Sequence, residues 1–362
     1  MAEKKTRRQA FCPRFVLRTQ VALVRNIRGV AFPGRLSERQ AAEIGDRLAQ
    51  RLMGLRPFVD ETKSEMFPPS RLEALFGLSA EGERGAGYHV LRLNEPRGEM
   101  PDIWCEVMSV NHLVFSMMVV GQVAEEQLAA FQAEVDSLAE PLDYVWHEQL
   151  GYLTAQLPLV GSGFRIRSWV HVPALSHFDC LAALSHAAEA FGVLADLDRP
   201  VSPPGDVVIL FNRSSLDGGA QTLRARVVEF VEVVKRREME MRKRLLCDEP
   251  FLLMDVLQRA GSVLRAALLI GEDEARDLLS DVVLGVSLGV VRIGRAANLS
   301  LLNTWYDCCS SAVLLNLPLS KEAPELPLSV REHPSWNVDA VRAQWLRQYS
   351  SLTISSWLLR RV

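Results

Sequence analysis

The pattern of apolar and polar positions in the first two thirds of the chain predicts a mixture of strands and helices. Phe15–Val24 has the pattern of a buried strand. Ser37 and Gln40 fit a capping box, and apolar residues then recur every four positions, which predicts a helix of about four turns. Ile103–Val120 is apolar in two halves that meet near Asn111, which predicts two strands. Further strands are expected within 152–172 and at 207–211, helices at 124–138 and 175–191, and a loop over 60–102.

From about residue 223 onward, the periodicity is helical throughout. Leu223, Val227 and Val231 share one face of a long helix that we expect to end near Leu246. Pro250 then interrupts the pattern, because proline cannot continue a helix interior. Later helices are predicted at 251–270, 272–290, 298–315 and 338–358, with a proline-rich stretch at 316–334. The predicted organisation is therefore a basic arm (1–13), an α/β domain (14–246) and an all-α domain (251–362).

Composition narrows the class of protein. The 362 residues include 41 Lys and Arg against 44 Asp and Glu, a formal charge of −3, which argues against a general nucleic-acid binder. No stretch reaches the roughly 18–20 apolar residues of a membrane span, and the polar, basic N-terminus is unlike a signal peptide. The six cysteines are scattered and form no C-x-x-C pair, which favours reduced thiols. We expect a cytoplasmic protein that binds neither nucleic acid nor membrane.

Several sequence blocks carry a resemblance to one family. Residues 148–155, 160–165 and 170–175 together resemble the pattern EQxGYLTxCPTNxGTGLRASVMxHLPAL of bacterial protein-arginine kinases. These enzymes are relatives of arginine and creatine kinase, the ATP:guanidino phosphotransferases. Three further blocks match in the same order, at 16–26, 107–114 and 279–289. The resemblance implies an α+β fold, with an antiparallel sheet flanked by helices, followed by an all-α C-terminal domain used in dimerisation and substrate recognition.

The same resemblance implies where phosphoryl transfer would take place, and there the charged residues are largely replaced. Family arginines that bind phosphate, carboxylates that hold the guanidinium and a cysteine have given way to uncharged side chains. These substituted positions are Gln20, Ala22, Ser109, Val110, Asn111, Val114 and Gln156. An arginine-bearing family loop is also replaced, at 196–200.

Few cationic candidates for a phosphate site remain. Arg165 alone matches a phosphate-binding arginine, as a remnant of the family site. Arg25 and Asn26 also match, with a phosphate role and a structural role both open. Arg167 and Arg213 lie nearby and are candidates to substitute for the missing arginines, although neither is at a family phosphate position.

The replacements favour a degenerate, inactive member of the family. A charge-assisted contact contributes roughly 1.5–3 kcal/mol, so the loss of four arginines removes about 6–12 kcal/mol of ATP binding. No carboxylate remains at the expected position of the base. We interpret the chain as a pseudokinase with no intact catalytic residue and no cofactor, acting in regulation or as a scaffold. The alternative is an active protein-arginine or guanidino kinase that uses Mg-ATP in a rearranged site.

The C-terminal region suggests a third function. Asp339 and Arg342 match two positions of the RDxxRA element with which protein-arginine kinases bind phosphoarginine, and Val338 replaces its first arginine. The resemblance thus allows an adaptor that binds a phosphoarginine peptide or another protein. The simpler interpretation is a surface ion pair, because residues at i and i+3 share a helix face.

Histidines outside these positions have structural interpretations. His112 and His171 lie on predicted strands, where a hydrogen-bonded core histidine is the simpler interpretation. His177 and His186 are nine residues apart and on different sides of a predicted helix, which argues against a metal site. We expect no metal.

The helical region predicts a homodimer. Residues 251–315 are apolar on more faces than a single helical layer buries, and such helices need partners inside the domain or across a two-fold axis. Light scattering at tens of micromolar is expected to give twice the chain mass of 40.5 kDa. A monomer mass under these conditions would contradict the prediction.

Overall fold

The computed structural model describes residues 14–64, 85–94, 100–196, 204–293, 305–314, 336–347 and 352–354. The predicted arm at 1–13 and the proline-rich stretch at 316–334 lie outside the described residues. Within the described segments, no helix is both long enough and apolar enough to cross a membrane.

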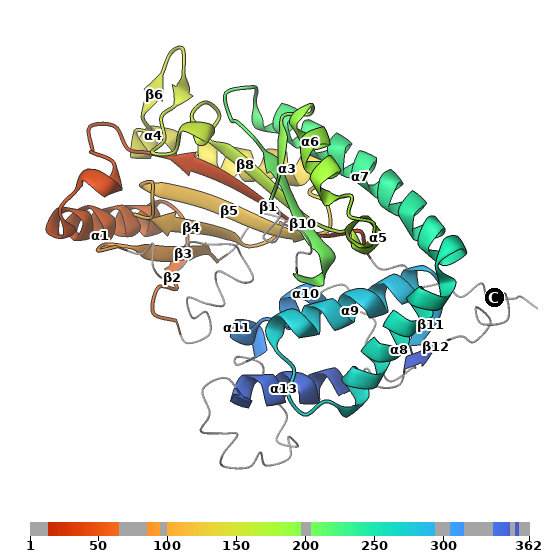
Figure 1. The fold of residues 1–362 in the computed structure, drawn as a ribbon. Helices are drawn as coiled ribbons and strands as arrows, with labels where there is room; N and C mark the ends of the chain where they lie inside the picture. The colour runs from red at the N-terminus through yellow and green to blue at the C-terminus, as the bar shows by residue number, and fades with distance from the viewer. Residues whose placement is uncertain are drawn as a thin grey trace, which may run out of the picture.

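An eight-stranded sheet forms the centre of the molecule, and its neighbouring strands are antiparallel (Figure 1). The strand order is β2-β3-β4-β5-β1-β8-β10-β9, so the first strand of the sequence lies near the middle. The strands are β1 (Val16–Arg25), β2 (Phe58–Asp60), β3 (His89–Leu93), β4 (Ile103–Val107), β5 (Leu113–Val120), β8 (Phe164–His171), β9 (Val193–Asp196) and β10 (Val207–Asn212). Two small two-stranded sheets are separate from it, β6 (Trp146–His147) with β7 (Gly151–Tyr152) and β11 (Val291–Ile293) with β12 (Leu352–Ile354).

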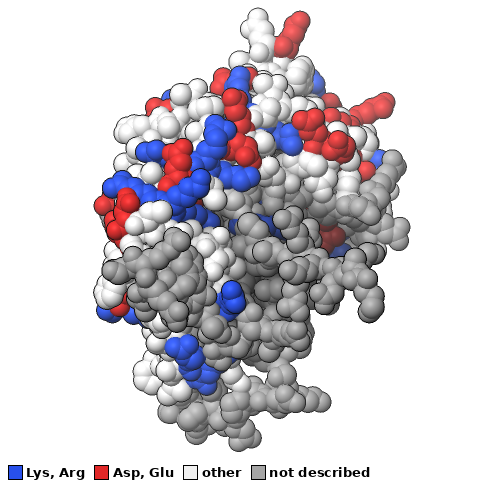
Figure 2. Space-filling model, turned by 90° about the vertical axis from the view of Figure 1, so that its right-hand side faces the viewer, with Lys and Arg blue, Asp and Glu red and all other residues white. Residues whose placement is uncertain are grey.

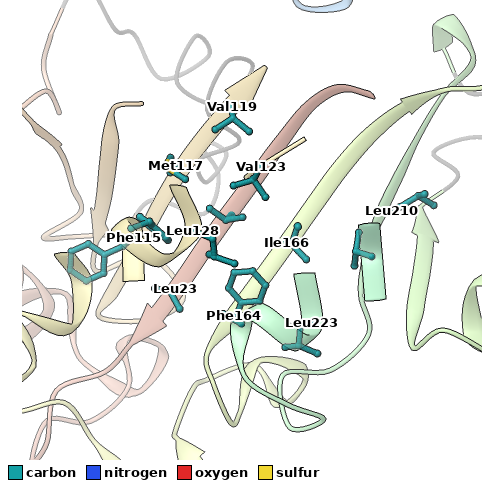
Figure 3. Close-up of a cluster of buried hydrophobic side chains, with 14 of the residues drawn as sticks. Leu23, Phe115, Met117, Val119, Val123, Leu128, Phe164, Ile166, Leu210 and Leu223 are labelled. Carbon is teal, nitrogen blue, oxygen red and sulfur yellow. The ribbon is translucent and has the colours of Figure 1, made fainter. Parts of the chain in front are cut away.

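Helices pack on one face of this sheet and bury its apolar side chains. Figure 3 shows Leu23, Phe115 and Phe164 from three neighbouring strands near Leu128 and Leu223 from the helices. The helices of the sheet region are α1 (Glu38–Leu55), α3 (Glu125–Asp136), α4 (Ala139–Leu142), α5 (Pro173–His177), α6 (Leu181–Glu189) and α7 (Ala220–Asp248). Their buried side chains and those of the strands form one apolar core.

Local sequence signals explain where two helices begin. The predicted capping box at the start of α1 is confirmed: the Ser37 hydroxyl accepts a hydrogen bond from the Gln40 N–H, and Gln40 Oε1 accepts one from the Ser37 N–H. Helix α8 has Pro250 at its first position, where no N–H is needed. The predicted break between the long helix and the helices that follow it is therefore confirmed.

The helices after Pro250 lie against the other face of the sheet, at one end (Figure 1). Helices α8 (Pro250–Ala266), α9 (Glu272–Ser287), α10 (Trp305–Cys308), α11 (Ser311–Leu314) and α13 (Trp336–Leu346) belong to this part. Their apolar side chains form a second core that also includes Leu17, Trp169 and Val207 of the sheet. The order of mixed α/β structure followed by helices is as predicted; the exact domain boundary stays a prediction.

Several predicted elements are wrong. The helix expected over 175–191 is two helices, because Asp179 adopts a left-handed conformation (φ 53°) between them. The loop expected over 60–102 contains β3, and Val193–Asp196 forms an edge strand that was not predicted. The helix expected at 298–315 is interrupted at 309–310 within its described part, and 352–354 are a strand instead of the end of a helix.

Charged side chains on the surface of α7 are paired along the helix. Lys235 lies near Glu232, Arg237 near Glu240 and Arg244 near Asp248, all exposed. Figure 2 shows the side of the molecule that carries α7, and on its upper part Lys and Arg side chains lie beside Asp and Glu. Such exposed pairs contribute little to stability.

A different ion pair is buried where α7 crosses the end of the sheet. Glu238 accepts a hydrogen bond from Arg242 Nε at 2.6 Å, and its carboxylate also accepts the N–H groups of Ala174 and Leu175 at the start of α5. Arg242 further donates to the carbonyl oxygen of His171 and to the Ser287 hydroxyl. This pair therefore joins α7 to β8, α5 and α9.

Breaking that pair is expected to destabilise the fold strongly. Arg242→Ala leaves the fully buried Glu238 carboxylate without its cation, which costs about 3–5 kcal/mol of unfolding free energy. Urea denaturation of both proteins measures the difference. The control is Arg237→Ala on the same helix, whose exposed pair with Glu240 is worth less than about 1 kcal/mol. Equal losses in the two variants would contradict this prediction.

Candidate functional site

Two of the substituted positions, Gln20 and Ala22, lie on the face of the sheet opposite the helices of the sheet region. This face is called the polar face, and it consists of Arg18, Gln20 and Ala22 of β1 with Arg165 and Arg167 of β8. In the antiparallel register, Gln20 lies opposite Arg167, and Ala22 lies opposite Arg165. Directly opposed residues point to the same side of a sheet, so these four share one surface. Arg167 Nη1 donates a hydrogen bond to Gln20 Oε1 at 3.4 Å. The structure thus brings the remnant arginine together with two substituted positions.

Arg165 is half-buried and held by the protein. Its Nη1 donates to the carbonyl oxygen of Asn212 at 3.0 Å, and its guanidinium lies 5.1 Å from the centre of the Phe211 ring. Burial, together with the positive charge of Arg167, lowers the pKa of Arg165 to about 10. Two neighbouring cations therefore remain on the polar face, and Arg213 is exposed beyond β10.

The helical part supplies a carboxylate to the other end of the polar face. Arg18 Nη1 lies 2.5 Å from Asp307 Oδ1, and the Arg18 guanidinium stacks 4.3 Å from the centre of the Trp169 ring. Burial raises the pKa of Asp307, while Arg18 and Arg276 oppose that shift. This contact links α10 to β1 and β8.

The loop between β4 and β5 contains the next group of substituted positions. Asn111 Oδ1 accepts hydrogen bonds from Asn26 Nδ2 at 2.9 Å and from the Ala155 N–H at 2.8 Å. Asn26 Oδ1 in turn accepts the His112 N–H at 2.8 Å. Asn111 therefore has a structural role: it ties this loop to the end of β1 and to the segment before Gln156.

His112 confirms the interpretation of a hydrogen-bonded core histidine. Its Nδ1 accepts the Ile27 N–H at 3.0 Å, and its Nε2 lies 2.9 Å from the carbonyl oxygen of Ala31. Burial lowers the pKa of His112, which favours the neutral ring. His171 is also fully buried, with Nε2 2.8 Å from the Ser280 hydroxyl.

Ser109 and Val110 border a cavity of about 730 Å³ beside the start of α1. Its other described walls are mainly apolar side chains and backbone, and Glu38 is the only carboxylate among the described lining residues. Thr154 and Ala155 complete one wall, next to the exposed Gln156. Val114 lies outside this wall, half-buried on β5 opposite Glu106. Apart from Glu38, the described wall of this cavity has no carboxylate with which to hold a guanidinium.

Arg25 and Asn26, whose roles were open, have structural roles. Arg25 Nη1 donates to the carbonyl oxygens of Val24 and Ser162, and its guanidinium stacks 3.6 Å from the centre of the Tyr152 ring. Because Arg25 alternates with Val24 along β1, it points away from the polar face.

Glu106 is a buried acid that the sequence analysis missed. It lies on β4 opposite Val114, and the Tyr88 hydroxyl donates to its Oε2 at 3.5 Å. The signal in the sequence was a single charged residue within an otherwise apolar strand, Ile103–Val107. A buried carboxylate in such a place is expected to be hydrogen-bonded, as this one is.

Arg342 and Asp339 are an interior contact, which corrects the expectation of a surface pair. Arg342 is fully buried, and its Nη1 lies 2.6 Å from Asp339 Oδ1. The guanidinium also donates to the carbonyl oxygens of Cys309 and Ile270 and to the Ser311 hydroxyl. These bonds join α13 to α11 and to the loop before α9, so the guanidinium that was to hold a phosphoarginine already has protein partners on all its nitrogens.

Among the described residues, no group of three or more His, Cys, Asp and Glu side chains is arranged to hold a metal ion. His177, one of the histidines considered for such a site, pairs instead with Glu249, Nε2 to Oε2 at 3.0 Å. The replaced family loop at 197–200 lies outside the described residues.

Comparison with known proteins agrees with this architecture. Residues 103–195 match the model of the ATP:guanido phosphotransferase C-terminal catalytic domain. The duplicated taurocyamine kinase from Schistosoma mansoni shares the fold, with a TM-score of 0.50 and 15% identity over 63% of this chain, which spans 32% of that longer chain.

Curated relatives cover most of the chain. The protein-arginine kinase of Symbiobacterium thermophilum is 29% identical over 288 residues, covering 76% of this chain and 80% of that protein. The protein-arginine kinase of Clostridium acetobutylicum is 24% identical over 328 residues, covering 88% and 95%. Over the matched part, the fold is that of this taurocyamine kinase. The chain is thus similar to protein-arginine kinases over most of its length, and residues 103–195 match the ATP:guanido phosphotransferase catalytic domain.

The buried position of Arg342 predicts a structural role that a stability measurement detects. Arg342→Ala removes the N–H groups that donate hydrogen bonds to Asp339 and to two carbonyl oxygens. This loss is expected to lower the unfolding free energy by about 2–4 kcal/mol. Phosphoarginine in millimolar excess should leave the melting temperature of the wild-type protein unchanged. A rise with phosphoarginine that is lost in Arg342→Ala and enlarged in Val338→Arg would instead support the adaptor.

Proposed function

We propose that this protein is a pseudokinase of the protein-arginine kinase family, with a regulatory or scaffolding role in place of phosphoryl transfer. The observation that carries the proposal is the polar face at Gln20 and Ala22. Both side chains lie in the β1–β8 register beside Arg165 and Arg167, where the family resemblance implies two phosphate-binding arginines. An amide and a methyl group stand there in their place.

The phosphate-binding potential of this face is correspondingly reduced. A guanidinium binds phosphate oxygens through paired, charge-assisted hydrogen bonds, whereas Gln20 offers a neutral amide and Ala22 offers no donor. Gln20 is also 4% exposed and already contacts Arg167. Gln20 and Ala22 do not fit the phosphate groups of a nucleoside triphosphate, so no catalytic step is assigned to them.

The guanidinium end of the reaction lacks its acids as well. Ser109 and Val110 border the cavity at positions where the family resemblance implies glutamates. Asn111 uses its side-chain oxygen to accept two N–H groups, so it holds the loop and not a substrate. A carboxylate base is therefore missing from the positions where the family resemblance implies one, and Glu38 is the one carboxylate on the described cavity wall.

One observation favours the second candidate, an active guanidino kinase with a rearranged site. Arg165 and Arg167 still present two neighbouring guanidinium groups on the polar face, and neighbouring cations favour an anion. Under this candidate the cofactor is Mg-ATP; under the pseudokinase there is none. In either case we propose a cytoplasmic homodimer that engages a protein partner.

Nucleotide binding separates the two candidates. Calorimetric titration with Mg-ATP at millimolar concentration is expected to show no saturable heat, because two phosphate-binding arginines and the acids are missing. A dissociation constant below about 100 µM, equivalent to about −5.5 kcal/mol, would overturn the pseudokinase. If such binding occurs, Arg165→Ala should abolish it, while Arg236→Ala on the exposed surface of α7 should not.

A further inference from the structure

A cluster of carboxylates lies where helix α9 meets the sheet region. Asp206, in the turn before β10, accepts a hydrogen bond from the Ser280 hydroxyl of α9 at 2.8 Å. Asp277 of the same helix accepts the Gly205 N–H at 2.7 Å. Asp281, the next residue after Ser280, lines a cavity of about 330 Å³ together with Asp206. Acidic groups from both parts of the molecule thus face each other across their contact.

The surroundings of Asp206 and Asp281 are largely apolar. Leu245, Leu253 and Leu284 line the same cavity, on α7, α8 and α9. Burial, together with the negative charges of Asp206 and Asp277, raises the pKa of Asp281 to about 8. Burial also raises the pKa of Asp206 to about 6, although its hydrogen bonds from Ser176 and Ser280 act in the opposite direction.

The cations that face the cluster already have other acidic partners. His177, from α5, pairs with Glu249. Arg242, from α7, pairs with Glu238, whose charge also acts on Asp206. Among the described residues, no Lys, Arg or His forms an ion pair with Asp206 or Asp281. Asp179, after α5, adds a further acid to the cavity wall.

The neighbouring histidine does not compensate these charges. His171 is fully buried, and burial together with Arg242 holds its pKa well below the usual range. The ring is therefore neutral, and its Nε2 contacts the Ser280 hydroxyl, which donates onward to Asp206. This chain of hydrogen bonds fixes the position of Asp206 but supplies no positive charge.

We propose that Asp206 and Asp281 form a pH-sensitive latch between helix α9 and the sheet region. While the two carboxyl groups retain protons, the contact is closed. When both are ionised, two negative charges in an apolar cavity repel each other, and the contact loosens. The latch is independent of nucleotide binding and therefore of the proposed function.

The direction of the pH dependence follows from the protons bound. Both pKa values in the folded protein lie above the ordinary value of about 4 for an aspartate. The folded protein therefore holds protons that the unfolded chain has released. Stability from the latch is fully present below pH 4 and is lost as the pH rises through 6 and 8. Carboxylates in ion pairs have the opposite effect, because the stability that they contribute is lost as the pH falls.

Thermal unfolding at pH 6 and pH 9 tests the latch. The melting temperature of the wild-type protein is expected to fall by about 3–6 °C over this interval. Asp281→Asn mimics the protonated group and should reduce the fall to less than half; Asp206→Asn serves as the second variant if the first fails to fold. The matched control is Asp255→Asn on α8, an exposed residue paired with Arg259, which should behave as the wild type does.

Hydrogen exchange locates the effect. After correction for intrinsic rates, amide protection in α9 around Ser280 should fall about tenfold between pH 6 and pH 9 in the wild type but not in Asp281→Asn. Protection in β1 should stay constant in both. The proposal would be overturned if the melting temperature fell equally in the wild type and both variants, or did not fall in the wild type. A loss of amide protection outside α9 and the 204–206 turn would also overturn it.

Discussion

Strand β1 is buried along its whole length, and the rest of the structure depends on this constraint. It pairs with β5 on one side and β8 on the other, so its backbone groups are satisfied from both directions. Val21 and Leu23 enter the core beneath the helices, while the alternate residues Gln20 and Ala22 form the polar face. Because the two sets point to opposite sides, the side chains of the polar face do not take part in the packing of the core.

The loop around Asn111 shows the same separation of shape from charge. Amide and imidazole hydrogen bonds among Asn26, Asn111 and His112 hold it in place. Neutral groups of this kind maintain a buried backbone conformation as well as charged ones do, provided that each donor and acceptor is paired. These bonds therefore keep the surface around Asn111 defined without a charged side chain.

Ionisable groups, in contrast, are concentrated where the helical part meets the sheet. Arg18 reaches Asp307, Arg242 reaches across to His171 and Ser287, and Asp206 reaches Ser280. Buried ionic contacts are sensitive to the loss of one partner or one proton, because the remaining charge is left in an apolar environment. The attachment of the helices to the sheet thus depends in part on ionisable side chains.

The sequence by itself determined the features that depend on neighbouring residues. Apolar-rich, strand-like patterns predicted β1 and the β4–β5 pair, the capping box at Ser37 predicted α1, and Pro250 predicted the break before α8. The spaced blocks around residues 148–175 identified the family. These signals are local, because they rest on the period of one element or on a side chain bonding its own helix end.

Only the tertiary structure decided which polar residues meet. The short strands β2, β3 and β9 are stabilised by pairing with distant neighbours, so their own sequences were weak signals. Arg342 had the spacing of a surface pair, but packing against the segments around Cys309 and Ile270 buried it. Asp206 and Asp281 are 75 positions apart, and only the docking of α9 on the sheet brings both to the wall of one cavity. Burial and long-range pairing are properties of the assembled chain, and no local period in the sequence encodes them.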